Sequence, residues 1–399
     1  MKPRLDPAHL VILAGISAAL HVGKLPPAIA VLQQALGMSL LQAGFLLSLV
    51  QLAGMSLGLA LGAVADGLGQ RRSILLGLTT LGLASLVGGA ATGVNHLLAL
   101  RVVEGFGFLL VVLPAPGLVR SLVPAQRLST TLGWWGAYMP TAMALALLVG
   151  PFWIQAWGWR GWWWALGLVS LLMALAMAFG VPRTPKLPRA AGLWWNSLRQ
   201  TLQAAGPWLV AGLFACYSGQ WLAVVGFLPT IYAQAGVPSA LAALLTAGVA
   251  AANIVGNVAA GRALQRGVAA PRLLGLGFVS MALASMVAFV PWGAPAELRF
   301  VAVLFFSGAG GLIPSTLFSL ALRVAPDERC VASTVGWMQQ WSSLGQFAGP
   351  PAVAWLAVQV GGWQSTWWFT AACCAVGLAL TGWLGLRLAR LRRAPRSQR

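Results

Sequence analysis

The sequence is dominated by long apolar stretches that carry no Asp, Glu, Lys or Arg. Only 8% of the 399 residues are charged and 59% are hydrophobic, whereas about 25% of an ordinary soluble domain is charged. A helix needs about 20 apolar residues to cross the roughly 30 Å hydrocarbon core of a bilayer. The composition therefore excludes a soluble globular protein. The charge-free stretches are residues 25–65, 128–159, 161–182, 200–261, 273–296, 300–322 and 330–386.

The formal net charge of +19 makes a nucleic-acid-binding protein the first alternative to consider. Such proteins gather their basic residues on one face or along one groove. Here the Lys and Arg residues are scattered between the apolar stretches. We therefore expect no nucleic-acid partner.

Turn-forming clusters divide the long stretches into membrane spans. Residues 232–239, for example, read Tyr-Ala-Gln-Ala-Gly-Val-Pro-Ser, a composition typical of a turn. Splitting each stretch at such clusters predicts an all-α integral membrane protein. The twelve predicted spans lie near residues 8–32, 40–65, 73–92, 95–118, 129–153, 161–181, 206–232, 239–260, 271–292, 298–322, 331–357 and 364–386.

The distribution of Lys and Arg predicts the orientation of these spans, because both residues concentrate in short cytoplasmic loops. With the N-terminus inside, only Arg160 and Arg299 fall in outside loops, and Lys24 and Arg101 fall within spans. We therefore expect a multi-pass protein of the cytoplasmic (inner) membrane with both termini in the cytoplasm. The first apolar stretch is longer than a signal peptide and carries Pro26-Pro27 instead of a cleavage site, so we interpret it as the first span.

The two halves of the sequence resemble each other. Residues 124–127 (Pro-Ala-Gln-Arg) are echoed by residues 326–329 (Pro-Asp-Glu-Arg), and the Gly-Trp pair at 158–159 by the pair at 362–363. Two six-span halves around a central pathway are typical of secondary transporters, which bind solute near mid-membrane where the halves meet. We predict a six-helix N-terminal bundle (residues 1–181), a cytoplasmic linker (182–205) and a six-helix C-terminal bundle with a basic tail (206–399).

The segment between the second and third predicted spans reads Gly62-Ala-Val-Ala-Asp66-Gly-Leu-Gly69-Gln-Arg71-Arg72. It resembles the loop motif Gly-x-Leu-Ala-Asp-Arg-x-Gly-Arg-Lys of the major facilitator superfamily, although Gly and Gln stand at two positions where Arg is usual. The resemblance covers essentially the whole chain and implies two pseudo-symmetric six-helix bundles. It also implies a tight turn whose ion pairs break and re-form as the bundles rock.

The fourth span carries a second mark, Arg101-Val-Val-Glu104-Gly-Phe-Gly, which is similar to the family's Arg-x-x-Gln/Glu-Gly-x-Gly signature. The antiporter signature of the fifth span is not clearly met, since a Gly-Pro pair arrives only at residues 150–151. This departure weighs against drug–proton antiport but does not exclude it. Residues 217–229 of the seventh span are similar to the branch of cyanate and nitroimidazole porters.

Ionisable residues inside spans carry the argument about mechanism, because a charge at the centre of a spanning helix costs about 2.5 to 3.5 kcal/mol. His21 and Lys24 are three residues apart in the first span, as are Arg101 and Glu104 in the fourth, so each pair shares a helix face. In one interpretation Lys24 and Arg101 bind an anionic substrate, while Glu104 and His21 serve proton coupling. In the other, Arg101 and Glu104 neutralise each other and Lys24 extends to the membrane interface.

The C-terminal half has no charged residue well inside a span, so its share of a binding site must be neutral. Tyr217, Gln220, Gln339 and Gln340 are the residues that we prefer as substrate contacts. Polar groups in spans also join helices by hydrogen bonds, and this is the alternative role for each of them. The wider set of candidates includes Ser218, Trp221, Asn253, Asn257 and Gln346.

The sequence shows no phosphate-binding loop, metal-ligand cluster or nucleophile–base arrangement, so we predict no cofactor, no metal and no enzymatic activity. It predicts a secondary transporter that moves a small solute, preferably a small organic or inorganic anion, by alternating access. Protons are the candidate coupling ion, and we expect a monomer among membrane lipids. The alternatives are efflux of hydrophobic or cationic compounds and a non-transporting membrane sensor.

Overall fold

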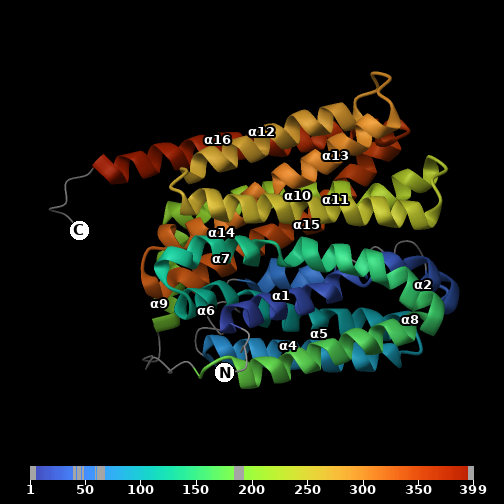
Figure 1. Cartoon of the computed structure of the whole chain (residues 1–399), viewed down its shortest axis with the longest axis horizontal. Helices are drawn as coiled ribbons and strands as arrows, with labels where there is room; N and C mark the ends of the chain where they lie inside the picture. The colour runs from blue at the N-terminus through green and yellow to red at the C-terminus, as the bar shows by residue number, and fades with distance from the viewer. Residues whose placement is uncertain are drawn as a thin grey trace.

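The computed structural model describes residues 6–38, 42, 46, 49–58, 60, 68–183 and 193–393, and no strand occurs among them. The N-terminal half lies below the C-terminal half in Figure 1, with long helices running along a common direction. The predicted all-α class is confirmed. One end of the molecule carries Asp6 and the start of the first helix, and we call it the termini end.

The N-terminal half has two breaks that follow from its sequence. After the first helix, Pro26 and Pro27 lack the N–H groups that a helix needs, and a short 3₁₀ turn replaces the α-helix. Gly158 is non-helical, with φ 70° and ψ 172°, and Figure 1 shows that α8 reverses its direction along its length. The elements are α1 (Pro7–Gly23), η1 (Pro26–Ala28), α2 (Ile29–Leu36), α4 (Gln70–Gly89), α5 (Val94–Val112), α6 (Ala115–Leu122), α7 (Ala125–Gly136) and α8 (Tyr138–Gly180).

The C-terminal half begins with a short helix in the predicted linker region. It consists of α9 (Leu193–Gln203), α10 (Ala205–Gln234), α11 (Ser239–Gln265), α12 (Ala270–Phe289), α13 (Ala296–Gly310), α14 (Leu312–Val324), η2 (Glu328–Cys330), α15 (Val331–Val360), η3 (Trp363–Ser365) and α16 (Thr366–Arg393). Within this half α10 packs along α15, and α12 packs against α13 and α16. Among the described elements, α7 and α8 of the N-terminal half pack against α11 of the C-terminal half, and α7 also packs against α14.

Nine helical segments of the described residues are long and apolar enough to cross a bilayer. The longest, residues 125–180, contains the reversal at Gly158 and covers the fifth and sixth predicted spans. The 30-residue helix α15 lies at the eleventh predicted span, and helical residues 49–58 lie within the second. The total of twelve spans and the cytoplasmic placement of the termini stay predictions.

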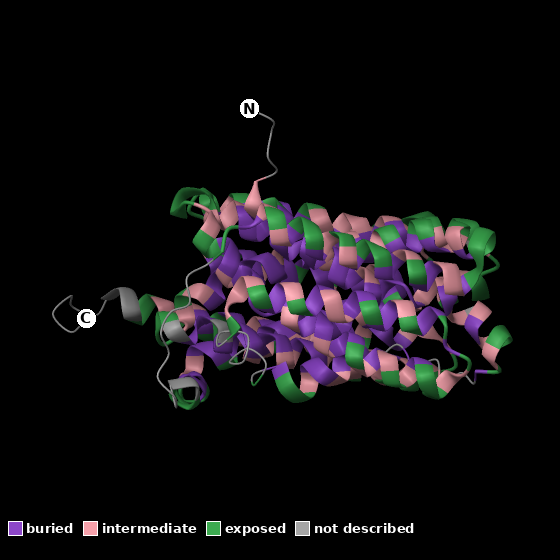
Figure 2. Ribbon diagram, turned by 90° about the horizontal axis from the view of Figure 1, so that it is seen from below, coloured by how far each residue is buried: buried purple, intermediate pink, exposed green. Residues whose placement is uncertain are grey.

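The outer surface is apolar, as contact with lipid requires. Figure 2 shows buried residues along the interior of the bundle and exposed ones around its outside. The exposed side chains include Phe179 at 89% exposure and Val358 at 78%. Soluble monomers rarely expose large contiguous apolar patches. The interior, by contrast, holds the buried polar side chains from which a binding site can be built.

Candidate functional site

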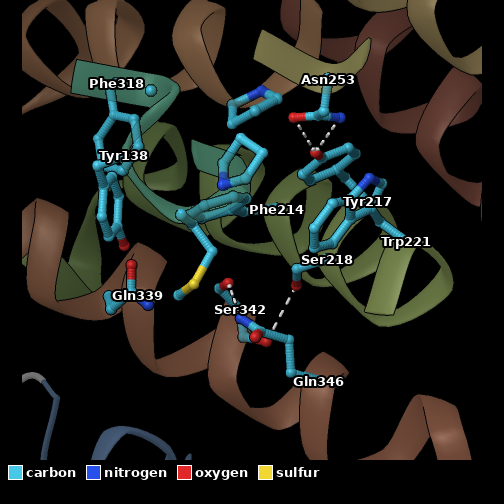
Figure 3. A pocket seen from close by; sticks show the side chains of 14 residues that line it. Tyr138, Phe214, Tyr217, Ser218, Trp221, Asn253, Phe318, Gln339, Ser342 and Gln346 are labelled. Atoms are coloured by element: carbon cyan, nitrogen blue, oxygen red, sulfur yellow. Dashed lines mark hydrogen bonds between the residues drawn. The ribbon is translucent and has the colours of Figure 1, made fainter. Parts of the chain in front are cut away.

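A small pocket lies between the two halves, where α7 and α8 meet α10, α11, α14 and α15 (Figure 3). Its cavity has a volume of about 40 Å³. That is room for water, whereas a site for an organic ligand usually encloses several hundred Å³. The surrounding helices must therefore move apart before a solute fits.

Hydrogen bonds fix the polar side chains on the α10 wall of the pocket. The side-chain amide of Asn253 on α11 donates to the Tyr217 hydroxyl oxygen over 3.0 Å and to the Ser307 carbonyl oxygen over 2.6 Å. The indole N–H of Trp221 donates to Ser307 Oγ over 3.0 Å. Tyr217 and Trp221 are four residues apart, so they lie on one face of α10, and these bonds hold that face toward the pocket.

A second wall comes from α15, which packs along α10. Ser218 Oγ donates to the Ser342 carbonyl oxygen over 3.0 Å, and Gln346 Nε2 donates to Ser342 Oγ over 3.1 Å. Gln339 is only 1% exposed, and its side-chain oxygen accepts no hydrogen bond from the part of the chain that the structure describes. A buried acceptor without a partner is costly, so Gln339 offers a contact that a bound solute can fill.

Aromatic rings complete the pocket. Phe214 stacks on Tyr217 with ring centroids 6.2 Å apart and meets Phe318 edge-on at 5.7 Å. On the side of the N-terminal half, Trp135 stacks on Tyr138 with centroids 4.6 Å apart. None of the 14 lining residues drawn in Figure 3 is Asp, Glu, Lys, Arg or His. The pocket is thus aromatic, with a few hydrogen-bonding groups and no formal charge.

The ionisable residues singled out in the sequence lie in a second place, inside the N-terminal half. Lys24 Nζ donates to Glu104 Oε1, and Arg101 NH1 lies 2.6 Å from Glu104 Oε2. Each of the three residues is at most 1% exposed. None of them lines the pocket of Figure 3. We call Lys24, Arg101, Glu104 and His21 the charged cluster.

Side chains from α4 and α8 pack around the charged cluster, whose own residues lie on and directly after α1 and on α5. Lys24 Nζ lies 3.1 Å from Ser85 Oγ on α4, 3.4 Å from His21 Nδ1 on α1, and 4.6 Å from the centre of the Trp163 ring on α8. His21 Nε2 lies 2.8 Å from Ser170 Oγ, also on α8. Lys24 therefore does not extend to the membrane interface, and that alternative is wrong.

The structure separates the four polar residues preferred in the C-terminal half. Tyr217 and Gln339 line the pocket. Gln220 faces α16, where its side-chain oxygen accepts from Cys374. Gln340 packs against helical residues 49–58 of the other half. Only one glutamine of the Gln339–Gln340 pair can point into the pocket, because consecutive helical residues lie about 100° apart.

Sequence reasoning misses the aromatic part of the pocket, above all Tyr138, Phe214 and Phe318. A signal was present for Phe214. With Tyr217, Ser218 and Trp221 it follows the i, i+3, i+4, i+7 spacing of a single helix face. Tyr138 and Phe318 have no comparable signal, since their elements meet α10 only in the folded chain.

Hydrogen bonds also join the two halves directly. Gln51 Nε2 donates to Gln346 Oε1 over 3.0 Å, and Ser343 Oγ donates to Gln51 Oε1 over 3.2 Å. Toward the termini end, Arg120 NH2 donates to Glu328 Oε1 over 2.7 Å. The described contacts between the halves therefore extend from the pocket to this end of the molecule.

The helices α7 and α11 approach closely through glycine. A methyl group built on Gly133 would meet the backbone of Gly261 at 2.9 Å, and one on Gly261 would meet Gly133 at 2.8 Å. Small residues let helix backbones come this near in a membrane protein. The crossing lies in the contact between the halves, beside the hydrogen bond from Ser315 Oγ to the Gly133 carbonyl oxygen.

The loop motif is described only from residue 68 onward, and Gly62 and Asp66 lie outside the described residues. Gly69 is the N-cap residue directly before α4 and has φ 88°, a conformation that favours glycine. Arg71 donates to the carbonyl oxygens of Val181 (2.9 Å) and Ala178 (2.5 Å) at the end of α8. Arg72 is exposed. Arg71 thus supplies donors to the free carbonyls of a helix C-terminus.

Known proteins resemble this chain over both halves. A model of the Major Facilitator Superfamily matches residues 11–215 and 209–399. An uncharacterized MFS-type transporter of Mycobacterium tuberculosis is 28% identical over 179 residues, which are 42% of this chain and 29% of that one. A bicyclomycin resistance protein homolog of Haemophilus influenzae is 24% identical, covering 71% of this chain and 73% of that one. An MFS-type efflux pump of Mycolicibacterium smegmatis is 29% identical, covering 70% and 67%.

Solved structures of low sequence identity share the fold. The transporter FucP, described in its outward conformation, superposes with a TM-score of 0.75 at 15% identity, covering 95% of this chain and 99% of that one. The proton:xylose symporter XylE superposes with a TM-score of 0.75 at 17% identity, covering 94% of each. With the family model matched across both halves and apolar helices suited to crossing a bilayer, the chain belongs to the Major Facilitator Superfamily and is a multi-pass membrane protein.

Proposed function

We propose that this transporter moves an uncharged organic solute with an aromatic part, bound in the pocket of Figure 3. The observation that carries the proposal is the pocket lining, in which aromatic rings and amide or hydroxyl groups occur without a formal charge. Ligand sites of this kind use apolar and aromatic surface for affinity and a few polar groups for orientation. Tyr217, Asn253 and the unpaired oxygen of Gln339 are the orienting groups.

The same proposal assigns the transport step to rocking of the two halves about the pocket. The cavity is too small for an organic solute, and the contacts toward the termini end hold the halves together. Breaking those contacts opens a path on that side, which the Lys and Arg distribution predicts to be cytoplasmic. We place the protein in the cytoplasmic membrane, as a monomer whose basic tails lie against anionic lipids.

Export is the direction that we propose. Two relatives are named a bicyclomycin resistance protein homolog and an MFS-type efflux pump, and the neutral aromatic pocket suits hydrophobic compounds. Import or export of a small anion, as the sequence predicts from Lys24 and Arg101, is the second candidate. One observation favours it, namely that two cationic side chains share the single carboxylate of Glu104.

Proton coupling is part of the proposal. Glu104, with His21 beside it, is the carboxylate in the described spans that is placed to exchange a proton. Because Lys24 and Arg101 each engage one of its oxygens, proton uptake by Glu104 requires at least one of these contacts to open. Rocking of the halves would supply that opening.

The test is a ligand screen followed by transport. The purified protein is heated in the presence of uncharged aromatic compounds, lipophilic cations, small carboxylates and inorganic anions, and compounds that raise the Tm are assayed for flux in proteoliposomes. We expect uncharged aromatic compounds to stabilise the protein and to be transported. Phe214→Ala should weaken their binding about tenfold, because it removes a buried aromatic wall.

The matched control is Gln220→Ala, a change on the same helix that faces α16 and should leave the solute affinity unchanged. Transport of carboxylates or inorganic anions, with uncharged compounds inert, would support the second candidate. Absence of flux across the whole panel would favour a membrane sensor and contradict both.

A further inference from the structure

The charged cluster holds more positive than negative charge. Lys24 and Arg101 both contact Glu104, and these three side chains are at most 2% exposed. The other partners of Arg101 are the carbonyl oxygens of Leu46 and His21, which carry no formal charge. Among the described residues, one positive charge is therefore left without a counter-charge in the interior of the N-terminal half. A buried charge without compensation costs several kcal/mol.

Loss of a proton from Lys24 would remove this charge, but the surroundings of Lys24 favour the ammonium form. Its nitrogen has three oxygen or nitrogen neighbours, Glu104 Oε1, Ser85 Oγ and His21 Nδ1. Ser85 Oγ already donates its own hydrogen to the Trp163 carbonyl oxygen over 2.8 Å, so it can only accept from Lys24. An ammonium group has three N–H donors, which serve the Glu104 and Ser85 oxygens and, in the tautomer that leaves it unprotonated, His21 Nδ1. The ring of Trp163 adds a favourable contact with a cation.

Arg101 provides the place for a counter-charge. Its Nε and NH1 atoms donate to Leu46, His21 and Glu104, but NH2 is buried and has no hydrogen-bond partner among the described residues. A guanidinium nitrogen carries two N–H groups. Buried polar groups are nearly always paired with protein, water or an ion. The unpaired NH2 calls for a hydrogen-bond acceptor, and the uncompensated positive charge of the Lys24–Glu104–Arg101 group calls for a negative charge. One negatively charged ligand at NH2 meets both requirements.

We infer that the N-terminal half binds a small monovalent inorganic anion at Arg101 NH2, as the counter-charge of the Lys24–Glu104–Arg101 group. A single negative charge neutralises the group, and a halide or an anion of similar size suits a donor enclosed by helices. This site is distinct from the pocket of Figure 3, which shares no residue with it. The inference goes beyond the proposed transport of an organic solute and holds whichever solute is moved.

The test measures thermal unfolding of the purified full-length chain in sodium chloride and in sodium gluconate at equal ionic strength. We expect chloride to raise the Tm by roughly 2–4 °C with saturation, since a ligand that binds only the folded state stabilises it. Equilibrium binding of ³⁶Cl⁻ should saturate at one ion per chain. Transport is not part of either measurement, so a failed solute assay leaves this test intact.

Variants that change the charge of the cluster should change the chloride response in opposite directions. Arg101→Lys keeps the charge but lacks the free NH2 group, and we expect the chloride affinity to fall about tenfold. Lys24→Met removes the excess charge and should abolish the chloride response. Glu104→Gln leaves two uncompensated cations and should enlarge it. The control is Arg160→Gln, an arginine that donates to the Gly89 carbonyl oxygen outside the cluster, and its chloride response should match that of the unmodified chain.

Equal Tm values in chloride and gluconate, together with no saturable ³⁶Cl⁻ binding, would overturn the inference. So would a chloride response that Arg101→Lys and Lys24→Met leave unchanged, because chloride would then bind elsewhere. If Arg101→Lys fails to fold, the other two variants still decide the question, because Lys24→Met should abolish the chloride-dependent rise in Tm and Glu104→Gln should enlarge it.

Discussion

The charged cluster illustrates what sequence spacing can and cannot indicate about single residues. The three-residue spacing of Arg101 and Glu104 permits an ion pair within α5, and the structure forms it. The partner on the other carboxylate oxygen, Lys24, is 80 residues away in the chain and reaches Glu104 only because α1 packs against α5. Glu104 therefore sits between two cations, and its capacity to carry a proton depends on how these contacts open.

At this scale we predict that Glu104→Gln abolishes accumulation driven by a pH gradient while solute exchange at equal pH persists. Glutamine keeps the size and hydrogen-bonding groups of the side chain but cannot take up and release a proton. The measurement is uptake into proteoliposomes with and without an imposed pH gradient. Glu297→Gln, which alters an exposed carboxylate at the start of α13, is the control. An unchanged pH dependence in Glu104→Gln would refute proton carriage by Glu104.

Helix faces decide which residues of an element reach the pocket. On α10, Phe214, Tyr217 and Trp221 share the face that meets the pocket, while Gln220 points to α16. Small residues decide how near two elements come, and at the crossing of α7 and α11 the backbones of Gly133 and Gly261 leave no room for a methyl group. We interpret this crossing as a contact that must form and break during transport.

For this element we predict that Gly261→Ala lowers the transport rate about tenfold with little change in solute affinity, because the added methyl group separates α7 from α11 and disfavours the closed arrangement. Initial rates in proteoliposomes and solute-dependent Tm shifts measure the two quantities. Gly248→Ala on the same helix is the matched control, since a methyl group there meets no atom within 4 Å. Equal rates for both variants would contradict a role for the crossing.

At the scale of the whole molecule, the two halves are joined around one pocket and toward one end. The exposed ion pair of Arg120 in α6 and Glu328 in η2 joins the N-terminal half to the C-terminal half. Arg127 and Asp6, which lie 3.8 Å apart, both belong to the N-terminal half. An exposed pair of this kind contributes little stability, about 0–1 kcal/mol. The Arg120–Glu328 pair is useful because its two residues are in contact only when the halves are closed at the termini end.

We predict that a covalent link between the halves at this point stops transport. In a background with the four native cysteines replaced by alanine, Arg120→Cys and Glu328→Cys are joined by a bifunctional reagent that forms reducible disulfides. Flux should fall about tenfold and recover on reduction, because alternating access requires the halves to separate. The same reagent on Arg127→Cys and Asp6→Cys links residues of one half and should leave flux unchanged. Full flux with the first pair linked would exclude rocking at this end.

The sequence by itself determines the membrane setting, the all-helical class and the family, because charge-free stretches, loop charges and the residues around Gly69 and Arg101 are local patterns. It also indicates Tyr217 and Gln339 as polar groups of a neutral C-terminal half. Only the tertiary structure decides that Lys24 and Arg101 lie inside one half, apart from the pocket, and that Tyr138 and Phe318 complete its aromatic wall. The physical reason is that spacing along a helix fixes which side chains share a face, whereas the element that this face meets depends on packing between residues distant in the chain.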